Sequence, residues 1–81
     1  MNEFVFEPIE VNADAPGGAR VVRSFDDIGA FILNSVDLTR RLSERWQAVR
    51  QNLIQARFGA RRAEVHAAMR KALAAEGWLA R

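Results

Sequence analysis

Apolar residues recur at helical spacing through the middle of the chain. They are separated by alternating steps of four and three residues, at Leu42, Trp46, Val49, Leu53 and Ala56. This spacing lines one face of a helix, and Leu38 extends the row backward by one turn. Asp37 or Thr39 is placed to cap the first turn. The pattern therefore predicts one long helix over residues 39–58 with this row on its buried face, while Ile54 lies off that face.

A second helical pattern covers residues 60–76. Its inner face is formed by Val65, Met69, Ala72 and Leu73. Alanines fill much of the remainder, and alanine has the highest intrinsic helix propensity. Gly59 and Gly77 stand just beyond the two helices, where glycine adopts a positive φ without strain. Because the joint over residues 58–60 is short, the two helices are predicted to be antiparallel neighbours.

The N-terminal part alternates in the manner of β-strands. Residues 4–11 are rich in aromatic and β-branched side chains, which favours a strand. Pro8 cannot donate a hydrogen bond to a neighbouring strand, so this strand is predicted to be an edge strand or to contain a bulge. Residues 12–18 form a turn with Pro16-Gly17 at its tip. Residues 19–23 then return as a second, shorter strand.

The next segment has the form of a helix start. Ser24 is placed to cap the amide three residues on, and Asp26 and Asp27 favour the positive end of the helix dipole. The predicted helix covers residues 25–34. Its buried face is supplied by Phe25, Ile28, Phe31 and Ile32.

Together these elements predict a single α+β domain over residues 1–81, with a β-hairpin followed by three helices, the last two an antiparallel pair. A two-stranded hairpin is only marginally stable alone, so it must pack on the helices or be completed by a second chain. A chain of 81 residues buries somewhat over ~60% of its unfolded surface, which makes its core thin. The predicted elements are the hairpin over residues 4–23 and helices over residues 25–34, 39–58 and 60–76.

The spacing of several residues resembles a known family. An opening Phe6-x-Pro8-Ile9-x-Val11 is followed by Gly18-x-Arg20-Val21-Val22-x-Ser24, by a first helix, and by helices ending at Gly59 and Gly77. This arrangement resembles the small bacterial family catalogued as domain of unknown function 982, which is common in rhizobia and their relatives. The resemblance implies the fold described above. It brings no assigned function and no catalytic residue.

Charge is divided unevenly along the chain, although the formal net charge is only +2. Residues 1–38 carry seven acids and two arginines, a net charge of −5, whereas residues 39–81 carry ten basic residues and three acids, a net charge of +7. Such a division suits a nucleic-acid-binding surface. It suits equally a fold, or a pair of subunits, in which the acidic and basic parts face each other, and this second interpretation is the simpler one.

The arginines support one functional hypothesis, because arginine is suited to bidentate contact with phosphates. The candidates in the second half are Arg40, Arg41, Arg45, Arg50, Arg57, Arg61, Arg62 and Arg70. Around the long predicted helix they flank the apolar face on both sides, which is typical of a solvated surface whose arginine stems cover the core edge. The densest basic patch is the corner at Arg57, Arg61 and Arg62. Nucleic-acid binding through this corner and Arg50 is therefore the alternative hypothesis.

The leading hypothesis is a non-enzymatic interaction module that associates with itself or with another protein. Apolar patches on an edge strand often mark interfaces. The candidate contact residues on the first strand are Phe4, Phe6, Pro8 and Ile9. The helical pair is the other candidate surface, and the thin core and the charge division both favour a homodimer.

The sequence contains no catalytic or metal-binding pattern. His66 is the only histidine and there is no cysteine, whereas a general base needs a positioned partner and a metal site needs three or four ligands. Asp26 and Asp27 are explained by helix capping. No Gly-x-Ser-x-Gly sequence and no phosphate-binding glycine loop is present. We expect no enzyme activity, no cofactor and no small-molecule substrate.

Composition also bears on localisation. The absence of cysteine is consistent with a reducing compartment. The sequence shows no signal peptide and no apolar segment near the ~20 residues needed to cross a bilayer. We expect a cytoplasmic protein without membrane contact.

Overall fold

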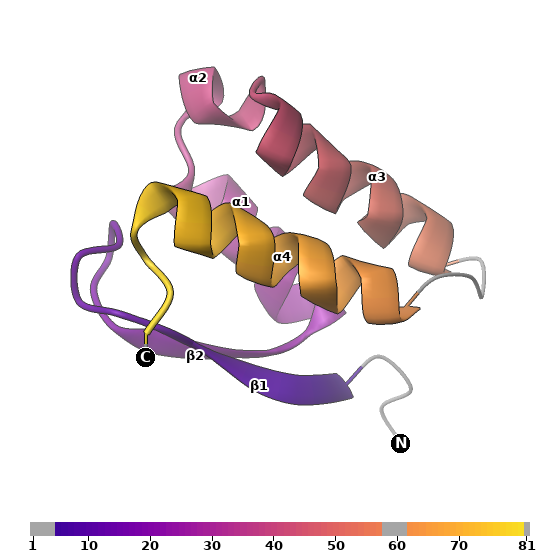
Figure 1. Ribbon diagram of the computed structural model, residues 1–81, viewed down its shortest axis with the longest axis horizontal. Helices are drawn as coiled ribbons and strands as arrows, with labels where there is room; N and C mark the ends of the chain where they lie inside the picture. Colours follow the sequence, from indigo (N-terminus) through magenta and orange to yellow (C-terminus); the bar gives the residue numbers. More distant parts are fainter. Residues whose placement is uncertain (1–4, 58–61, 81) are drawn as a thin grey trace.

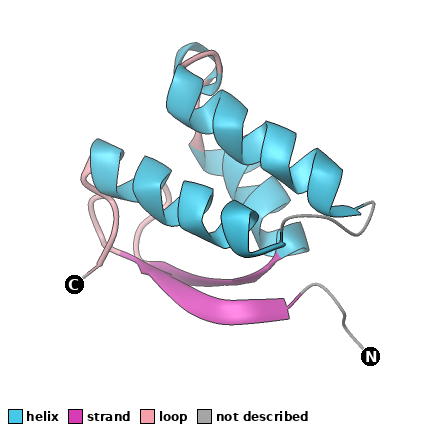
Figure 2. Ribbon diagram, turned by 45° about the vertical axis from the view of Figure 1, so that its right-hand side comes forward, coloured by secondary structure: helices cyan, strands magenta, loops and turns pink. Residues whose placement is uncertain are grey.

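A computed structural model describes residues 5–57 and 62–80 of the chain. Its elements are β1 (Val5–Val11), β2 (Arg20–Ser24), α1 (Phe25–Ser35), α2 (Leu38–Arg41), α3 (Glu44–Arg57) and α4 (Arg62–Glu76). The helices gather on one face of the hairpin, with α3 beside α4 (Figure 1). A second view shows the two strands as a separate layer under the helices (Figure 2). The predicted α+β class, with an N-terminal hairpin followed by helices, is confirmed.

The hairpin pairs β1 with β2 in antiparallel register. Ile9 is opposite Val22, and both side chains are buried under the helices. The register shifts between Val5 and Ile9, the interval that contains Pro8. Because proline lacks an N–H, the ladder cannot continue through it. The predicted irregularity at Pro8 is confirmed.

The turn between the strands has the predicted tip. Gly17 and Gly18 have φ values of 87° and 85°, a region that favours glycine. The guanidinium of Arg20 donates to the Pro16 carbonyl at 3.1 Å and occupies the space where a Cβ on Gly17 would lie. The positive φ therefore favours glycine at position 17, and a side chain there would also displace the Arg20 guanidinium.

The C-terminal segment lies along the second edge of β1, which the sequence pattern did not predict. The Asn12 N–H donates to the Trp78 carbonyl at 2.8 Å, and the Ala80 N–H donates to the Glu10 carbonyl at 2.9 Å. Val11 and Leu79 form an isolated antiparallel bridge at the same place. β1 remains an edge strand of the two-stranded sheet, but the C-terminal segment covers its end near Val11.

The first helix begins as its sequence predicts. Ser24 is the N-cap, and its hydroxyl oxygen accepts from the Asp27 N–H at 3.2 Å. The Asp27 carboxylate in turn accepts from the Arg23 N–H at 2.9 Å. The first bond satisfies an amide that a helix start leaves without a partner, and the second ties the residue before the cap to the first turn. The four predicted inward-facing residues of this helix are all buried.

The predicted helix over residues 39–58 is wrong, because the structure divides it into α2 and α3. The Asp37 side chain caps α2 by accepting from the Arg40 N–H at 2.8 Å. The Ser43 hydroxyl then donates to the Arg40 carbonyl at 2.6 Å. A serine side chain that bonds nearby backbone competes with helix continuation. Leu38 and Leu42, predicted on the buried row, are 68% and 64% exposed.

The remainder of the row behaves as predicted. In α3 the buried residues are Trp46, Val49, Leu53 and Ala56, and in α4 they are Val65, Met69, Ala72 and Leu73. The two helices run in opposite directions and contact each other, which confirms the antiparallel pair (Figure 1). Their joint at Phe58, Gly59 and Ala60 lies outside the described residues.

The end of α4 is the predicted glycine cap. Gly77 has a φ of 80°, its N–H donates to the Ala74 carbonyl at 3.1 Å, and the Trp78 N–H donates to the Leu73 carbonyl at 2.8 Å. These two bonds define a Schellman ending. They turn the chain so that Trp78 enters the core, where it is 6% exposed.

Three aromatic rings pack against one another at the centre of the molecule. The ring centroids of Phe31 and Trp46 are 6.0 Å apart, and those of Trp46 and Trp78 are 6.3 Å apart. Because these residues come from α1, α3 and the C-terminal segment, the cluster joins parts that are distant in sequence. Trp46 is a core residue, as predicted, and Trp78 is a second one.

Candidate interaction surface

The strand residues proposed as an interface belong largely to the protein's own packing. Ile9 is completely buried, so its side chain is not available to a partner. Phe6 is half-buried, with its ring 5.8 Å from that of Phe25 and 5.2 Å from that of His66. Pro8 is exposed. Phe4 lies outside the described residues.

The backbone edge of β1 is also occupied by the same chain. His66 Nε2 lies 3.0 Å from the Glu7 carbonyl oxygen, and since a carbonyl only accepts, this nitrogen carries the hydrogen and donates. Further along, the Glu10 carbonyl accepts from Ala80. His66 therefore anchors α4 to β1, and the described part of this edge offers little free backbone to an added strand.

The basic corner lies mostly outside the described side chains. Arg61 is not described, and the side chains of Arg57 and Arg62 are likewise outside the description. Arg50 is exposed on α3. The corner therefore stays a prediction, and of the four proposed nucleic-acid contacts only Arg50, which lies outside the corner, has a described side chain.

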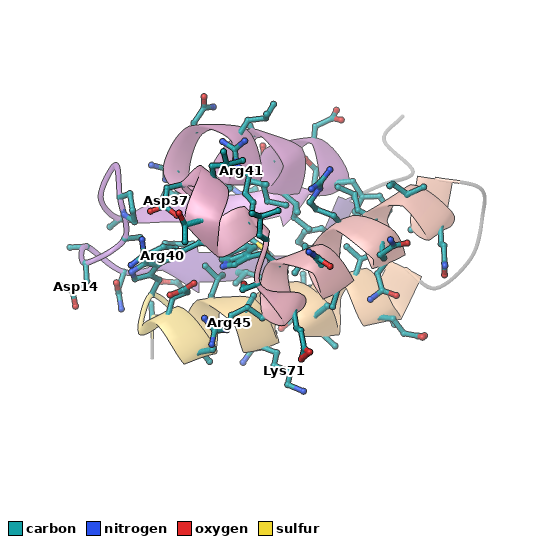
Figure 3. All side chains as sticks on the ribbon, turned by 90° about the horizontal axis from the view of Figure 1, so that it is seen from above. Asp14, Asp37, Arg40, Arg41, Arg45 and Lys71 are labelled. Atoms are coloured by element: carbon teal, nitrogen blue, oxygen red, sulfur yellow. The ribbon has the colours of Figure 1, made fainter. Side chains whose placement is uncertain are left out.

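Two other arginines surround a carboxylate that the sequence pattern did not single out. Glu76, at the end of α4, has a side chain that is only 9% exposed. Its oxygens accept from Trp46 Nε1 at 2.9 Å, from Arg40 Nε at 3.3 Å and from Arg45 Nη1 at 3.4 Å. Figure 3 shows Arg40 and Arg45 near this end of α4. One carboxylate thus links α2, α3 and α4.

The environment of Glu76 favours its ionised form. Burial by itself raises the pKa of Glu76, but the hydrogen bonds from Trp46 and Arg40 and the charges of Arg40 and Arg45 outweigh it. The pKa of Glu76 is therefore held below its ordinary value. The Arg40 guanidinium also lies over the Trp78 ring, 5.4 Å from its centroid. These contacts engage Arg40 and Arg45 within the fold.

Arg41 is engaged in a different way. Its Nε donates to the Val36 carbonyl at 2.8 Å and its Nη2 donates to the Leu33 carbonyl at 2.9 Å. These carbonyls belong to the end of α1, where a helix leaves acceptors without partners. Figure 3 shows Arg41 between α1 and α2. The side chain therefore fastens α2 to α1.

The exposed aliphatic side chains gather beside α2. Leu33 is 69% exposed, Leu38 68%, Leu42 64% and Ile54 54%. All four line one groove of about 550 Å³ between α1, α2 and α3, together with Arg41 and Arg50. We refer to this feature as the α1–α2–α3 groove. Among the described large hydrophobic residues, the remaining exposed one is Val21 on β2, at 41%.

The groove follows from the break between α2 and α3. The short α2 has no buried residue, so Leu38 stands outside the core beside Leu42. Leu33 and Ile54 lie off the buried faces of α1 and α3. The sequence contains one sign of this groove. Ile54 is an apolar residue that lies off the buried face of its predicted helix. The four aliphatic side chains line one groove only because the helix is interrupted at Ser43. The sequence pattern did not reveal that interruption.

The described residues contain no group of three or more His, Cys, Asp or Glu side chains that could hold a metal ion. Within the same part of the chain, every buried side-chain nitrogen or oxygen has a hydrogen-bond partner. None of the helices in residues 5–57 and 62–80 combines the length and apolar character needed to span a membrane.

Comparison with known proteins gives no relative. A scan against protein-family models, a search of curated proteins and a search of solved structures each found no match. The functional argument therefore depends on the geometry of the chain itself.

Proposed function

We propose that this protein is a non-enzymatic interaction module that self-associates through the α1–α2–α3 groove. The observation that supports the proposal is the collection of four aliphatic side chains, each more than half exposed, in one groove. A single exposed leucine needs no explanation, but a contiguous apolar patch marks an interaction site. We favour this surface over the strand edge of β1, where Ile9 is buried and the Glu7 and Glu10 carbonyls are engaged within the chain.

A second copy is the occupant that the apolar patch favours. Fully burying a leucine or isoleucine side chain contributes ~1.5–3 kcal/mol. In a two-fold dimer the same patch is buried on both copies, so covering its exposed parts contributes on the order of 10 kcal/mol. Association costs roughly 4–15 kcal/mol. At the low end of this cost the net is about −6 kcal/mol, which corresponds to a dissociation constant on the order of tens of micromolar.

Nucleic-acid binding remains the second hypothesis. Arg40, Arg41 and Arg45 are engaged within the fold, which reduces the positive charge available for phosphates. The resemblance to domain of unknown function 982 also stays a prediction. We place the protein in the cytoplasm on the absence of cysteine, which suits a reducing compartment.

The oligomeric state tests the proposal. Sedimentation velocity over roughly 5–500 µM should show the wild type shifting from monomer to dimer, a range set by the micromolar affinity expected. The Leu42→Glu variant places a charge in the groove, so it should remain monomeric while keeping its helicity by circular dichroism. Val21→Glu, which changes an exposed aliphatic residue on β2, should associate like the wild type. A wild type that is monomeric throughout this range contradicts the proposal.

A further inference from the structure

We propose that the self-association is a two-fold pairing in which α1 of each copy lies in the groove of the other and Asp26 of one copy faces Arg50 of the other. The inference rests on the proposed function and specifies its geometry. It depends on the exposed stripe of α1, on the charge lining the groove and on the directions of α1 and α3.

The exposed stripe of α1 contains an acid, a small residue and a leucine. At 100° per residue, Asp26 lies about 20° from Leu33 around the helix and Gly29 lies about 40° away on the other side. Leu33 and Gly29 line the groove, and no atom lies within 4 Å of where a Cβ on Gly29 would be. A second helix can therefore approach the α1 backbone at this position.

The groove presents a positive charge that the described residues leave unpaired. Arg50 lies one turn before Ile54 on α3, and both line the groove. Arg50 is exposed and forms no ion pair with another described residue, whereas Arg41 is bound to the end of α1. Asp26 is exposed and also has no ion-pair partner in the described part of the chain. Among the described residues, an acid on the exposed stripe of α1 and a base in the groove thus have no ion-pair partner.

The directions of the helices bring these two groups together. α1 ends beside α2 and α3 begins beside it, so the two run in opposite directions along the groove (Figure 1). If the α1 helices of the two copies are antiparallel, α1 of the second copy therefore runs parallel to α3 of the first copy. When its Leu33 lies beside Ile54, its Asp26 is displaced seven residues, about 10 Å, toward the start of α3. That is the level of Gln47, and Arg50 lies three residues, about 4.5 Å, further along α3, a distance that its long side chain can span.

An isologous interface must be complementary to itself, because the same patch is present on both sides. A stripe with one acid and one base meets this condition, and the pairing occurs twice across the two-fold axis. The other acid near this face, Asp37, is bound to Arg40 at 2.9 Å. The pairing also agrees with the division of the chain into an acidic and a basic half. A second copy therefore fits the groove in shape and in charge.

Charge reversal in trans tests the pairing. Asp26→Arg puts two arginines opposite each other in its homodimer, and Arg50→Asp puts two aspartates opposite each other, so each variant alone should dimerise at least about tenfold more weakly. In an equimolar mixture both contacts become Arg–Asp pairs. We expect the mixture to form heterodimers of wild-type affinity, measured by sedimentation with one variant fluorescently labelled.

Matched controls separate this result from general charge effects. Asp14→Arg, in the hairpin turn, and Arg70→Asp, on α4, make the same charge changes on exposed residues outside the groove. Neither should weaken the dimer. If Leu42→Glu abolishes dimerisation but the mixture of charge variants does not regain it, the pairing is wrong and the groove remains the interface. If the wild type never dimerises, both proposals are wrong.

Discussion

At the scale of single residues, Glu76 has a structural role that its position in the sequence does not indicate. It is the last residue of α4, where the sequence indicates only a helix end. The structure shows a nearly buried carboxylate that accepts from Trp46, Arg40 and Arg45. These donors come from residues 30 to 36 positions earlier in the chain. Its role depends on tertiary packing, so no local pattern could predict it.

Replacing Glu76 by glutamine should lower stability mainly at neutral pH. The amide oxygen still accepts from Trp46, but the charge that attracts both arginines is lost. Because the Arg40 and Arg45 side chains are 46% and 44% exposed, solvent screens part of this attraction. We expect a loss of about 1–2 kcal/mol in the free energy of unfolding at pH 7, measured by urea denaturation with tryptophan fluorescence.

The same variant should differ from the wild type in its pH dependence. The folded-state pKa of Glu76 lies below its ordinary value of 4.5, so the carboxylate contributes stability above pH 4.5 and loses it as the pH falls through the folded-state pKa. The difference between wild type and Glu76→Gln should therefore shrink on acidification. Glu44→Gln, on the exposed first turn of α3, should change stability little at either pH. An equal difference at pH 7 and at about pH 3 would contradict the assigned ionic contribution.

At the scale of elements, the sequence predicts what depends on local chemistry. The Ser24 cap, the irregularity at Pro8 and the glycine ending at Gly77 each follow from one residue type in one position. The break at Ser43 could not be predicted, because the row of apolar residues continues through Leu42 at the spacing of a single helix. The hydroxyl of Ser43 can either face solvent or bond the backbone, and only the assembled fold decides between these states.

Two glycine substitutions should act in opposite directions. Gly77 has a φ of 80°, so Gly77→Ala strains the backbone although its Cβ meets no atom within 4 Å. We expect a loss of about 1 kcal/mol. Gly29 lies within α1 and also has free space, so Gly29→Ala should stabilise the monomer by about 0.5–1 kcal/mol. Thermal and urea denaturation at low protein concentration measure both effects, and a loss in both variants would show that the Gly29 site is not open.

At the scale of the whole molecule, the sequence predicts the layers of the fold better than its surface. Buried rows of apolar residues determine which faces pack, and nearly all of those assignments are confirmed. The groove requires Leu33, Leu42 and Ile54 to meet across three helices, and a linear pattern contains no information about that meeting. The covering of β1 by the C-terminal segment is equally non-local. Of the predicted strand surface, Ile9 is buried within the core and the Glu7 and Glu10 carbonyls accept hydrogen bonds from the chain's own residues, contacts that the linear pattern does not contain.

The distribution of charge over the molecule gives the last prediction. Arg40, Arg41 and Arg45 already contact Glu76, Asp37 or backbone carbonyls, which reduces the positive charge available to bind phosphate. We expect fluorescence anisotropy with duplex DNA, single-stranded DNA and RNA to show no micromolar binding at about 200 mM salt and only weak binding at about 50 mM. Tight binding that falls steeply with salt and disappears in an Arg57/Arg61/Arg62→Glu variant of unchanged helicity would instead make the basic corner the functional surface. A reduction in the Arg50→Asp variant as well would extend that surface into the groove, where phosphate and a second copy would compete for one arginine.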